Sequence, residues 1–234
     1  HRPGWFGFLG DDPFGIAIRN AIRGEGVDVS RVKLIKEAPT GLMFRDLQYG
    51  QLSVYYYRNT SAARLMTPQD LDEAYISRAK VLHVTGITPA LSDSCRVTVF
   101  AAVELARRNG VKVCLDPNLR LKLWSAAEAR EVIWKLAESA DYFLPGLDEL
   151  KLLFPDLDEE GIYRKLETLS SVTVVKADGK AIVLETGRRQ AVDWFPVRTV
   201  VDPVGAGDGF CAGFLSGLLR GFTHVEAARL GNLV

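Results

Sequence analysis

The chain has 234 residues, of which 47% are hydrophobic and 25% are charged. This balance is typical of a globular domain with a buried core, and it excludes an intrinsically disordered chain. The 29 basic and 29 acidic side chains cancel, so no basic field favours nucleic acid or an anionic membrane as a partner. The longest nearly apolar stretch, residues 209–219, is too short to cross a bilayer.

Cysteine and histidine residues are too few and too scattered for a disulfide framework or a zinc site. The three cysteines, Cys95, Cys114 and Cys211, are odd in number and form no C-x-x-C pair. They favour a reducing compartment, and we expect the protein in the cytoplasm. The three histidines are equally dispersed. His83 lies in the middle of a predicted strand and is expected to be a core histidine.

Predicted strands and helices alternate along most of the chain. The strands lie at residues 4–9, 80–86, 111–115, 142–144, 172–176 and 199–201, and the helices at residues 92–109, 125–139 and 210–220. A further helix should begin at Thr223, which forms a capping-box pattern with Glu226, and should continue beyond Val234. Strands separated by helix-length crossovers predict a mainly parallel sheet covered on both faces, a Rossmann-like three-layer α/β/α fold.

One segment departs from this alternation. Residues 41–48 and 51–57 alternate in polarity around Tyr49-Gly50, which predicts a β-hairpin. We expect residues 40–58 to form a small flap, or lid, beside the main sheet. The chain as a whole is expected to be one domain over residues 1–234, truncated at both ends, because it opens almost directly on a strand and stops inside a helical pattern.

The strongest functional signal is D-P-V-G-A-G-D-G at residues 202–209, between a predicted strand and a predicted helix. A glycine-rich turn in that place presents free backbone N–H groups at the positive end of the helix dipole, which favours an anion. The alternative is a helix start that needs glycine only for tight packing against a strand. Asp208 favours the first interpretation, because a carboxylate held ionised beside a phosphate suits a base next to a transferring phosphoryl group.

Two other phosphate-binding motifs fit poorly. A Walker A motif at Gly179-Lys180 fails because Val174 and Ala181 occupy its other defining positions. The spacing Gly207-x-Gly209-x-x-Ala212 matches a dinucleotide fingerprint, but no acidic residue follows at the end of a next strand. The carboxylate of Asp208 would also repel a pyrophosphate.

The D-P-V-G-A-G-D motif and the apolar helix after it resemble the signature of the ribokinase-like (PfkB) carbohydrate kinases. The resemblance extends over nearly the whole chain: G-D-D-P-F-G at residues 10–15, G-V-D at 26–28 and D-P-N-L-R at 116–120 also match. Within the family, the chain is most similar to the 2-keto-3-deoxygluconate kinases, through Y-Y-R-N-T-S-A-A at residues 56–63 and T-G-I-T-P-A-L at 85–91.

The resemblance implies a role for several residues. Asp208 would be the general base, and Gly205, Ala206 and Gly207 would form the anion hole. The sugar acid would contact Tyr56, Arg58, Ile87 and Arg120, and ATP would lie near Lys176, Asp178, Gly179 and Gly207. Glu149 matches the acid of an N-x-x-E motif associated with Mg²⁺ and phosphate, although Gly146 stands in place of its Asn. Met43 and Asp178 also depart from the pattern, where a Tyr and a Gly are usual.

Two arginines support a sugar acid as the substrate, independently of the family resemblance. A 2-keto acid carries a carboxylate that suits the fork of a guanidinium, whereas ribose and fructose need no cation. Arg58 ends a predicted flap strand, and Arg120 lies in a loop after a predicted strand, where α/β sheets place ligands. The alternative is that both are solvated surface residues. The three consecutive tyrosines at residues 55–57 could equally be ordinary strand residues, and alternation leaves only Tyr56 on its own face.

We therefore expect a cytoplasmic kinase that uses ATP and Mg²⁺ to phosphorylate 2-keto-3-deoxygluconate to its 6-phosphate. The residues leave open a kinase for another sugar or a nucleoside, such as fructose, ribose or adenosine, and a non-catalytic sensor on the same fold. Dependence on a monovalent cation is also open. The expected partners are the small-molecule substrates and further copies of the chain in a homo-oligomer.

Overall fold

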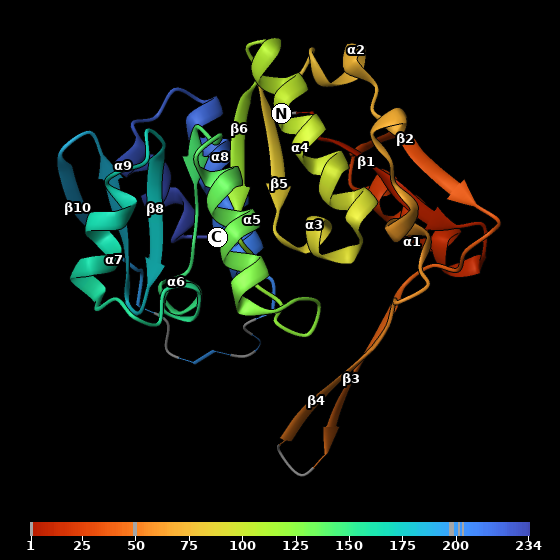
Figure 1. The fold of residues 1–234 in the computed structure, drawn as a ribbon, viewed down its shortest axis with the longest axis horizontal. Helices are drawn as coiled ribbons and strands as arrows, with labels where there is room; N and C mark the ends of the chain where they lie inside the picture. The colour runs from red at the N-terminus through yellow and green to blue at the C-terminus, as the bar shows by residue number, and fades with distance from the viewer. Residues whose placement is uncertain (1, 49–50, 197–198, 201, 203) are drawn as a thin grey trace. The chain divides into compact units, whose positions relative to one another are not determined.

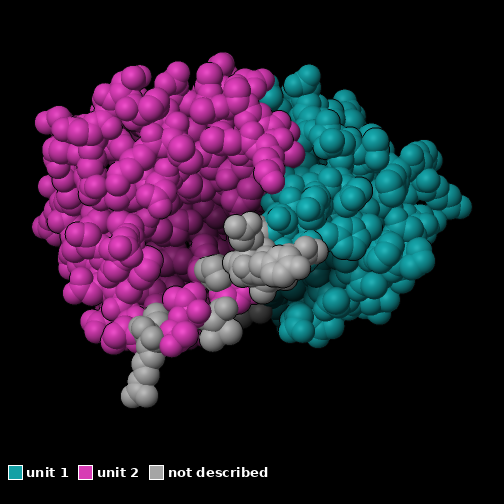
Figure 2. All heavy atoms as spheres, turned by 90° about the horizontal axis from the view of Figure 1, so that it is seen from below, with its two compact units in different colours: residues 1–71, 91–98 teal, residues 72–90, 99–234 magenta. Residues whose placement is uncertain are grey.

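The computed structural model describes residues 2–48, 51–196, 199–200, 202 and 204–234 (Figure 1). The chain divides into two compact units, coloured separately in Figure 2. Unit 1 consists of residues 1–71 and 91–98, and unit 2 of residues 72–90 and 99–234. The single domain predicted over residues 1–234 stays a prediction. Among the described residues, no helix has the length and apolar character needed to span a membrane.

Unit 1 begins with a strand, a helix and a second strand. Strand β1 (Gly4–Gly10) confirms the strand predicted at the start of the chain, and helix α1 (Pro13–Gly24) follows it directly. Strand β2 (Asp28–Ile35) runs parallel to β1, with Gly7 paired with Val32. Short 3-10 helices follow later in the unit at Ala62–Leu65 and Pro68–Asp70.

The turn between β1 and α1 explains the spacing of its two glycines. The Asp12 carboxylate accepts hydrogen bonds from the Gly15 N–H at 2.8 Å and the Thr40 N–H at 2.7 Å. The Thr40 hydroxyl in turn accepts one from the Gly10 N–H at 2.9 Å. A Cβ on Gly10 would collide with the Thr40 nitrogen, and one on Gly15 with the Gly10 carbonyl. Both glycines are therefore needed for the close approach of the segment that leads into the flap.

The predicted β-hairpin is confirmed. Strands β3 (Leu42–Gln48) and β4 (Gln51–Tyr57) are antiparallel, and Met43 pairs with Tyr56. The turn predicted at Tyr49-Gly50 lies outside the described residues. Phe44 and Tyr57 make an edge-to-face ring contact with centroids 5.7 Å apart. Tyr56 is thus on the opposite face from this ring pair, as alternation along a strand requires.

Unit 2 is built on a six-stranded sheet in the order β10-β9-β8-β7-β6-β5. The strands are β5 (Val81–Thr85), β6 (Lys112–Asp116), β7 (Tyr142–Phe143), β8 (Val172–Ala177), β9 (Lys180–Glu185) and β10 (Arg188–Asp193). Strands β5 to β8 are parallel, whereas β9 and β10 are antiparallel additions at one edge. The mainly parallel sheet was predicted, and the antiparallel pair was not.

Helices cover both faces of this sheet (Figure 1). Helices α8 (Ala206–Leu219) and α9 (His224–Gly231) bury Phe210 and Phe214 against one face, over Cys114 and Val174. The opposite face lies under α5 (Ala126–Ala137), α6 (Leu147–Leu153) and α7 (Glu159–Leu166). Strands β6 and β8 are therefore buried over most of their length, which confirms the predicted α/β/α layering.

Two helices begin at the capping residues that the sequence predicted. Ser125 and Glu128 form the capping box that starts α5, and Thr223 and Glu226 form the one that starts α9. The helix predicted at residues 92–109 is α4 (Asp93–Arg108), preceded by the shorter α3 (Ile87–Leu91). A further short helix, α2, spans Glu73–Ile76.

Three predicted boundaries were wrong. Of the strand predicted at residues 199–201, Thr199 and Val200 are in no strand and Val200 is 66% exposed, while residue 201 is outside the described part. A run of three residues is too short to specify a partner strand. Periodicity alone therefore cannot decide whether such a run forms a strand. Helix α8 begins at Ala206, four residues earlier than predicted. Helix α9 ends at Gly231 with Asn232 as its C-cap, so it stops before Val234, whereas the prediction had it run through that residue.

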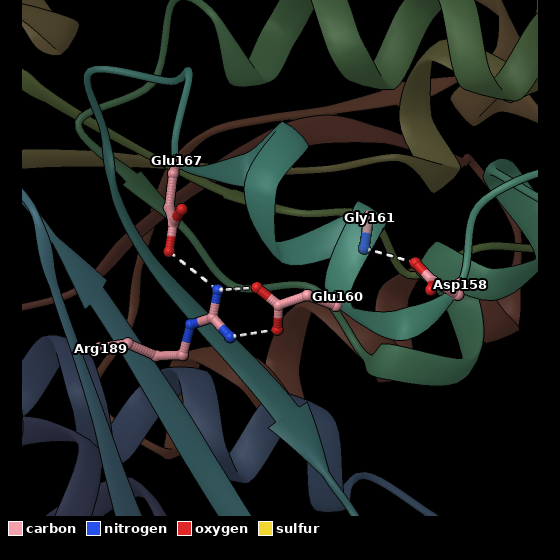
Figure 3. A network of polar contacts seen from close by, with 5 residues as sticks. All are labelled: Asp158, Glu160, Gly161, Glu167 and Arg189. Atoms are coloured by element: carbon pink, nitrogen blue, oxygen red, sulfur yellow. Dashed lines mark hydrogen bonds and ion pairs between the residues drawn. The ribbon is translucent and has the colours of Figure 1, made fainter.

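An ion-pair network joins the antiparallel edge of the sheet to α7 (Figure 3). The Arg189 guanidinium on β10 donates to both Glu160 carboxylate oxygens, at 2.8 and 3.1 Å, and to Glu167 at 2.9 Å. It also lies over the Tyr163 ring, 4.5 Å from the centroid. The planar fork of an arginine is what permits this double contact with one carboxylate.

Candidate functional site

The glycine-rich motif forms the N-terminus of α8. Gly205 is the N-cap and has φ 83° and ψ −2°, a left-handed conformation that glycine adopts without strain. Its carbonyl accepts the Gly209 N–H at 2.7 Å, which starts the helix. The N–H groups of the first turn have no partner within the helix, so they are available to an anion. Asp208 is exposed in this same turn.

The space around the glycines argues against the packing interpretation. Among the described residues, nothing lies within 4 Å of a Cβ built on Gly205. A Cβ on Gly207 would meet only the Lys176 Nζ, at 3.7 Å. Neither glycine is therefore required for close packing against a strand. The left-handed backbone conformation requires glycine at position 205. Glycine at position 207 leaves space beside the ammonium group of Lys176.

Lys176 is part of a buried ion pair at the carboxyl ends of two parallel strands. Its Nζ lies 3.0 Å from the Asp116 Oδ1, and the two side chains are only 16% and 3% exposed. Burial acts to lower the pKa of Lys176, but the charge and hydrogen bond of Asp116, together with the nearby Cys211 and Glu149, raise the pKa overall. The lysine is therefore held as a cation next to Gly207. Asp116 ends a strand that is otherwise apolar after its first residue, a signal that the sequence prediction left without a role.

His83 is close enough to feel these charges. Desolvation lowers its pKa, while the carboxylates of Asp116 and Asp208 act in the opposite direction. His83 pairs with Cys114 in the sheet, yet its side chain is exposed, so its prediction as a core histidine was wrong. The carboxylates of Asp116 on β6 and Asp208 in the α8 turn thus both act on the same histidine.

Glu149 in the first turn of α6 holds two loops together. Its Oε1 accepts a hydrogen bond from the Leu119 N–H at 2.6 Å, and its Oε2 accepts one from the Gly146 N–H at 2.8 Å. Gly146 also forms a parallel bridge with Lys176. The loops after β6 and β7 and the end of strand β8 are thereby joined at one edge of the sheet. In the described residues, no group of three His, Cys, Asp or Glu side chains could hold a metal ion.

The remaining predicted residues are distributed over both units. In unit 2, Arg120 is exposed, with its Nη1 donating to the Leu119 carbonyl at 3.0 Å, and Ile87 is the half-buried first residue of α3. Asp178 and Gly179 form the exposed turn between β8 and β9, where Gly179 has φ 71°. In unit 1, the Arg58 guanidinium lies 4.1 Å from the Tyr56 ring centroid. Unit 2 thus brings Lys176 to the α8 turn and joins Glu149 to the Arg120 loop.

The sequence profile of pfkB family carbohydrate kinases matches residues 1–234. The chain belongs to the PfkB family of carbohydrate kinases. It is 37% identical over 238 residues to a 2-dehydro-3-deoxygluconokinase of Bacillus subtilis (strain 168), with 100% of this chain and 74% of that protein covered. It is also 37% identical over 220 residues to one of Thermoproteus tenax, with 91% and 66% covered. The chain therefore spans about two thirds to three quarters of these relatives.

Solved structures of PfkB-like proteins agree with this fold. The crystal structure of a PfkB protein from Polaromonas sp. JS666 superposes with a TM-score of 0.89 at 35% identity, covering 100% of this chain and 78% of that one. An E. coli protein provisionally named ribokinase II, solved with ATP and Mg²⁺, gives a TM-score of 0.88 at 25% identity, covering 98% and 74%. The family, the ribokinase-like fold and the carbohydrate-kinase class predicted from the sequence are confirmed.

Proposed function

We propose that this PfkB-family chain transfers the γ-phosphoryl group of ATP to 2-keto-3-deoxygluconate, giving the 6-phosphate. Both relatives at 37% identity carry the name 2-dehydro-3-deoxygluconokinase, an equivalent name for a kinase of this sugar acid. The observation that carries the chemistry is the α8 turn, where an exposed carboxylate, a left-handed glycine and open N–H groups occur together beside a buried lysine. The structure of the similar E. coli protein with bound ATP and Mg²⁺ supports the choice of ATP as the phosphoryl donor.

The residues of the α8 turn have separate roles in this proposal. Asp208 removes the proton of the attacking hydroxyl while its oxygen forms a bond to the γ-phosphorus and the bond to ADP breaks. The N–H groups of Gly205, Ala206 and Gly207 stabilise the charge that develops on the transferring group. Lys176 adds a fixed positive charge, and the turn at Asp178-Gly179 lies on the ATP side.

Mg²⁺ would reach the site with the nucleotide. The ion is typically held by substrate phosphates and one or two carboxylates, and it neutralises phosphate charge when bound. Both oxygens of Glu149 already accept backbone N–H groups. We propose that Glu149 acts on the metal only indirectly, through the backbone groups that it holds.

Arg120 is the proposed carboxylate receptor of unit 2. Its exposed guanidinium follows the carboxyl end of β6, the edge at which open α/β sheets bind ligands. Ile87 lies after the neighbouring strand β5 and would contact the carbon chain of the sugar. The roles of Tyr56 and Arg58 in sugar binding stay predictions from the resemblance.

The test is an ADP-release assay on the full chain with a panel of sugar acids and neutral sugars. The panel contains 2-keto-3-deoxygluconate, fructose, ribose and adenosine. Arg120→Ala should lower kcat/KM for the sugar acid by roughly 10–150-fold, the value of one charge-assisted hydrogen bond, and should change activity on a neutral ketose little. Arg120→Lys should restore activity in part, because it keeps the charge but not the fork.

Arg130→Ala, an exposed arginine on α5 of the same unit, is the matched control and should behave as the wild type. Equal losses on both substrates in Arg120→Ala would assign the residue to loop structure or phosphate binding instead. A wild type that prefers a neutral sugar would refute the sugar-acid assignment and leave the general carbohydrate-kinase activity.

We further propose a homo-oligomer in the cytoplasm, as the sequence predicts. The three cysteines are free and buried, which supports a reducing compartment. Light scattering of the purified chain tests the oligomeric state, and the same ADP-release assay with and without K⁺ tests dependence on a monovalent cation.

A further inference from the structure

The backbone of Leu119 connects two charged side chains of unit 2. Its N–H donates to the Glu149 Oε1 at 2.6 Å, and its carbonyl accepts from the Arg120 Nη1 at 3.0 Å. The Leu119 side chain is buried, with 9% of the residue exposed. The Glu149 carboxylate on α6 thus contacts the N–H of Leu119, and the Arg120 guanidinium contacts the carbonyl oxygen of the same residue.

Among the residues that the structure describes, few other backbone hydrogen bonds hold the loop that carries Arg120. Its beginning is held by the Gly86 N–H, which donates to the Asp116 carbonyl at 2.9 Å, and its end by the Leu123 N–H, which donates to the Arg120 carbonyl at 2.9 Å. Between them, Asn118 has φ 39°, a conformation that non-glycine residues adopt infrequently. The bond from Glu149 is the charge-assisted contact in the middle of this segment.

We propose that Glu149 is a positioning residue: it fixes the backbone at Leu119, whose next peptide carries the carbonyl that accepts the Arg120 guanidinium, and thereby holds that guanidinium in place for the substrate carboxylate. Glu149 suits this role because its second oxygen is anchored by the Gly146 N–H at the start of its own helix. One carboxylate oxygen is fixed to the start of its own helix and the other to a neighbouring loop. The side chain therefore sets the distance between the helix and the loop. The α6 N-terminus is thus a rigid support for the loop.

This role differs in its consequences from a direct part in metal binding. A carboxylate that contacted Mg²⁺ would add its negative charge to the binding of the ion, through lone pairs that the two N–H bonds leave free. Its removal would then raise the Mg²⁺ concentration needed for activity, whichever sugar is used. A positioning residue leaves the Mg²⁺ requirement unchanged and affects the substrate that needs Arg120.

The inference rests on the proposed function, and the experiment separates the two. Glu149→Gln keeps the shape of the side chain but has only one acceptor oxygen, so it loses one of the two N–H bonds. We expect kcat/KM for 2-keto-3-deoxygluconate to fall about 10-fold through KM, with an unchanged Mg²⁺ activation curve. Asp148→Asn, an exposed carboxylate in the same helical turn, is the matched control and should change neither.

A double-mutant cycle tests whether Glu149 acts through Arg120. Once Arg120 has become Ala, the further change Glu149→Gln should lower kcat/KM less than 2-fold, because its effect has already been lost. Additive losses, or a shifted Mg²⁺ curve, would overturn the proposal. Glu149→Asp, which is too short to reach both loops, provides a second variant if the Gln protein folds poorly.

Amide hydrogen exchange supplies a measurement that needs no substrate. The Leu119 amide should exchange at least 10-fold faster in Glu149→Gln than in the wild type, while amides of the neighbouring strand β6 keep their protection. Unchanged Leu119 exchange would refute the positioning role. If the wild type instead prefers a neutral sugar, the proposed function fails, and this exchange measurement still decides whether Glu149 holds the loop.

Discussion

Lys176 on β8 and Asp116 on β6 form an ion pair across the sheet of unit 2, with 3.0 Å between the Nζ and Oδ1 atoms. Strand β7 lies between their two strands, so the pair joins two strands that are not neighbours in the sheet. Both groups are nearly inaccessible, and a buried charge that loses its partner costs about 3–5 kcal/mol. The pair therefore fixes a cation beside the first turn of α8.

Asp116→Asn should reveal this dependence in a pH profile. In the wild type the raised pKa keeps Lys176 charged, and the stability that this provides is present below pH 10.5 and lost only above that value. Without Asp116, burial is the largest influence on Lys176 and is opposed only by the weaker effects of Cys211 and Glu149, so we expect its pKa to fall. We expect kcat/KM for ATP to fall with rising pH in the variant, within a range where the wild type is flat.

The matched control for that experiment is Asp141→Asn. Asp141 pairs with Lys112 at 2.7 Å, but both side chains are more exposed and the pair involves the first residue of β6. The variant should keep the wild-type pH profile of ATP use. A flat profile in Asp116→Asn as well would show that Lys176 needs no partner to stay charged, or that its charge does not assist ATP.

Asp208→Asn tests the general base. The amide keeps the shape of the side chain and removes the proton acceptor, so kcat should fall by about 10²–10⁴ with little change in ATP affinity. Steady-state kinetics and nucleotide titration measure the two quantities. Near-normal turnover would leave Asp208 a positioning role at most.

The two glycines of the α8 turn should respond differently to substitution. Gly205→Ala places a Cβ on a backbone at φ 83° and should cost about 1–2 kcal/mol of stability. Gly207→Val extends toward the Lys176 Nζ, into space that phosphate would use, so activity should be lost while the melting temperature changes little. A Gly207→Val protein that unfolds before it loses phosphotransfer would restore the packing interpretation of this turn.

Arg189→Met should affect stability and leave the kinetics unchanged. The hydrogen bond from Arg189 lowers the pKa of Glu160, so its contribution to stability is present above pH 4.5 and is lost as the pH falls through the lowered value. The melting temperature of the variant should lie below that of the wild type at pH 7, and the difference should shrink toward pH 3. An equal difference at both pH values would assign the loss to the contact with the Tyr163 ring instead.

The sequence by itself determined the local features of this protein. Capping boxes such as Ser125 with Glu128 connect residues three apart, and hairpin register depends on alternation within two adjacent segments. The motif at the start of α8 was visible for the same reason, because its chemistry lies in eight consecutive residues. Short apolar runs were less informative: residues 199–200 proved not to be a strand.

Only the tertiary structure decided which side chains meet. Lys176 and Asp116 are 60 residues apart, and Glu149 and Leu119 are 30 apart. Parallel strands bring such residues to one edge of the sheet through helical crossovers, whose lengths say nothing about pairing. Asp116 therefore had no role until its partner was known, and Glu149, whose place near a metal stays a prediction, has oxygens that accept N–H groups of two loops. Contacts of this kind depend on strand order, which no local pattern of residues encodes.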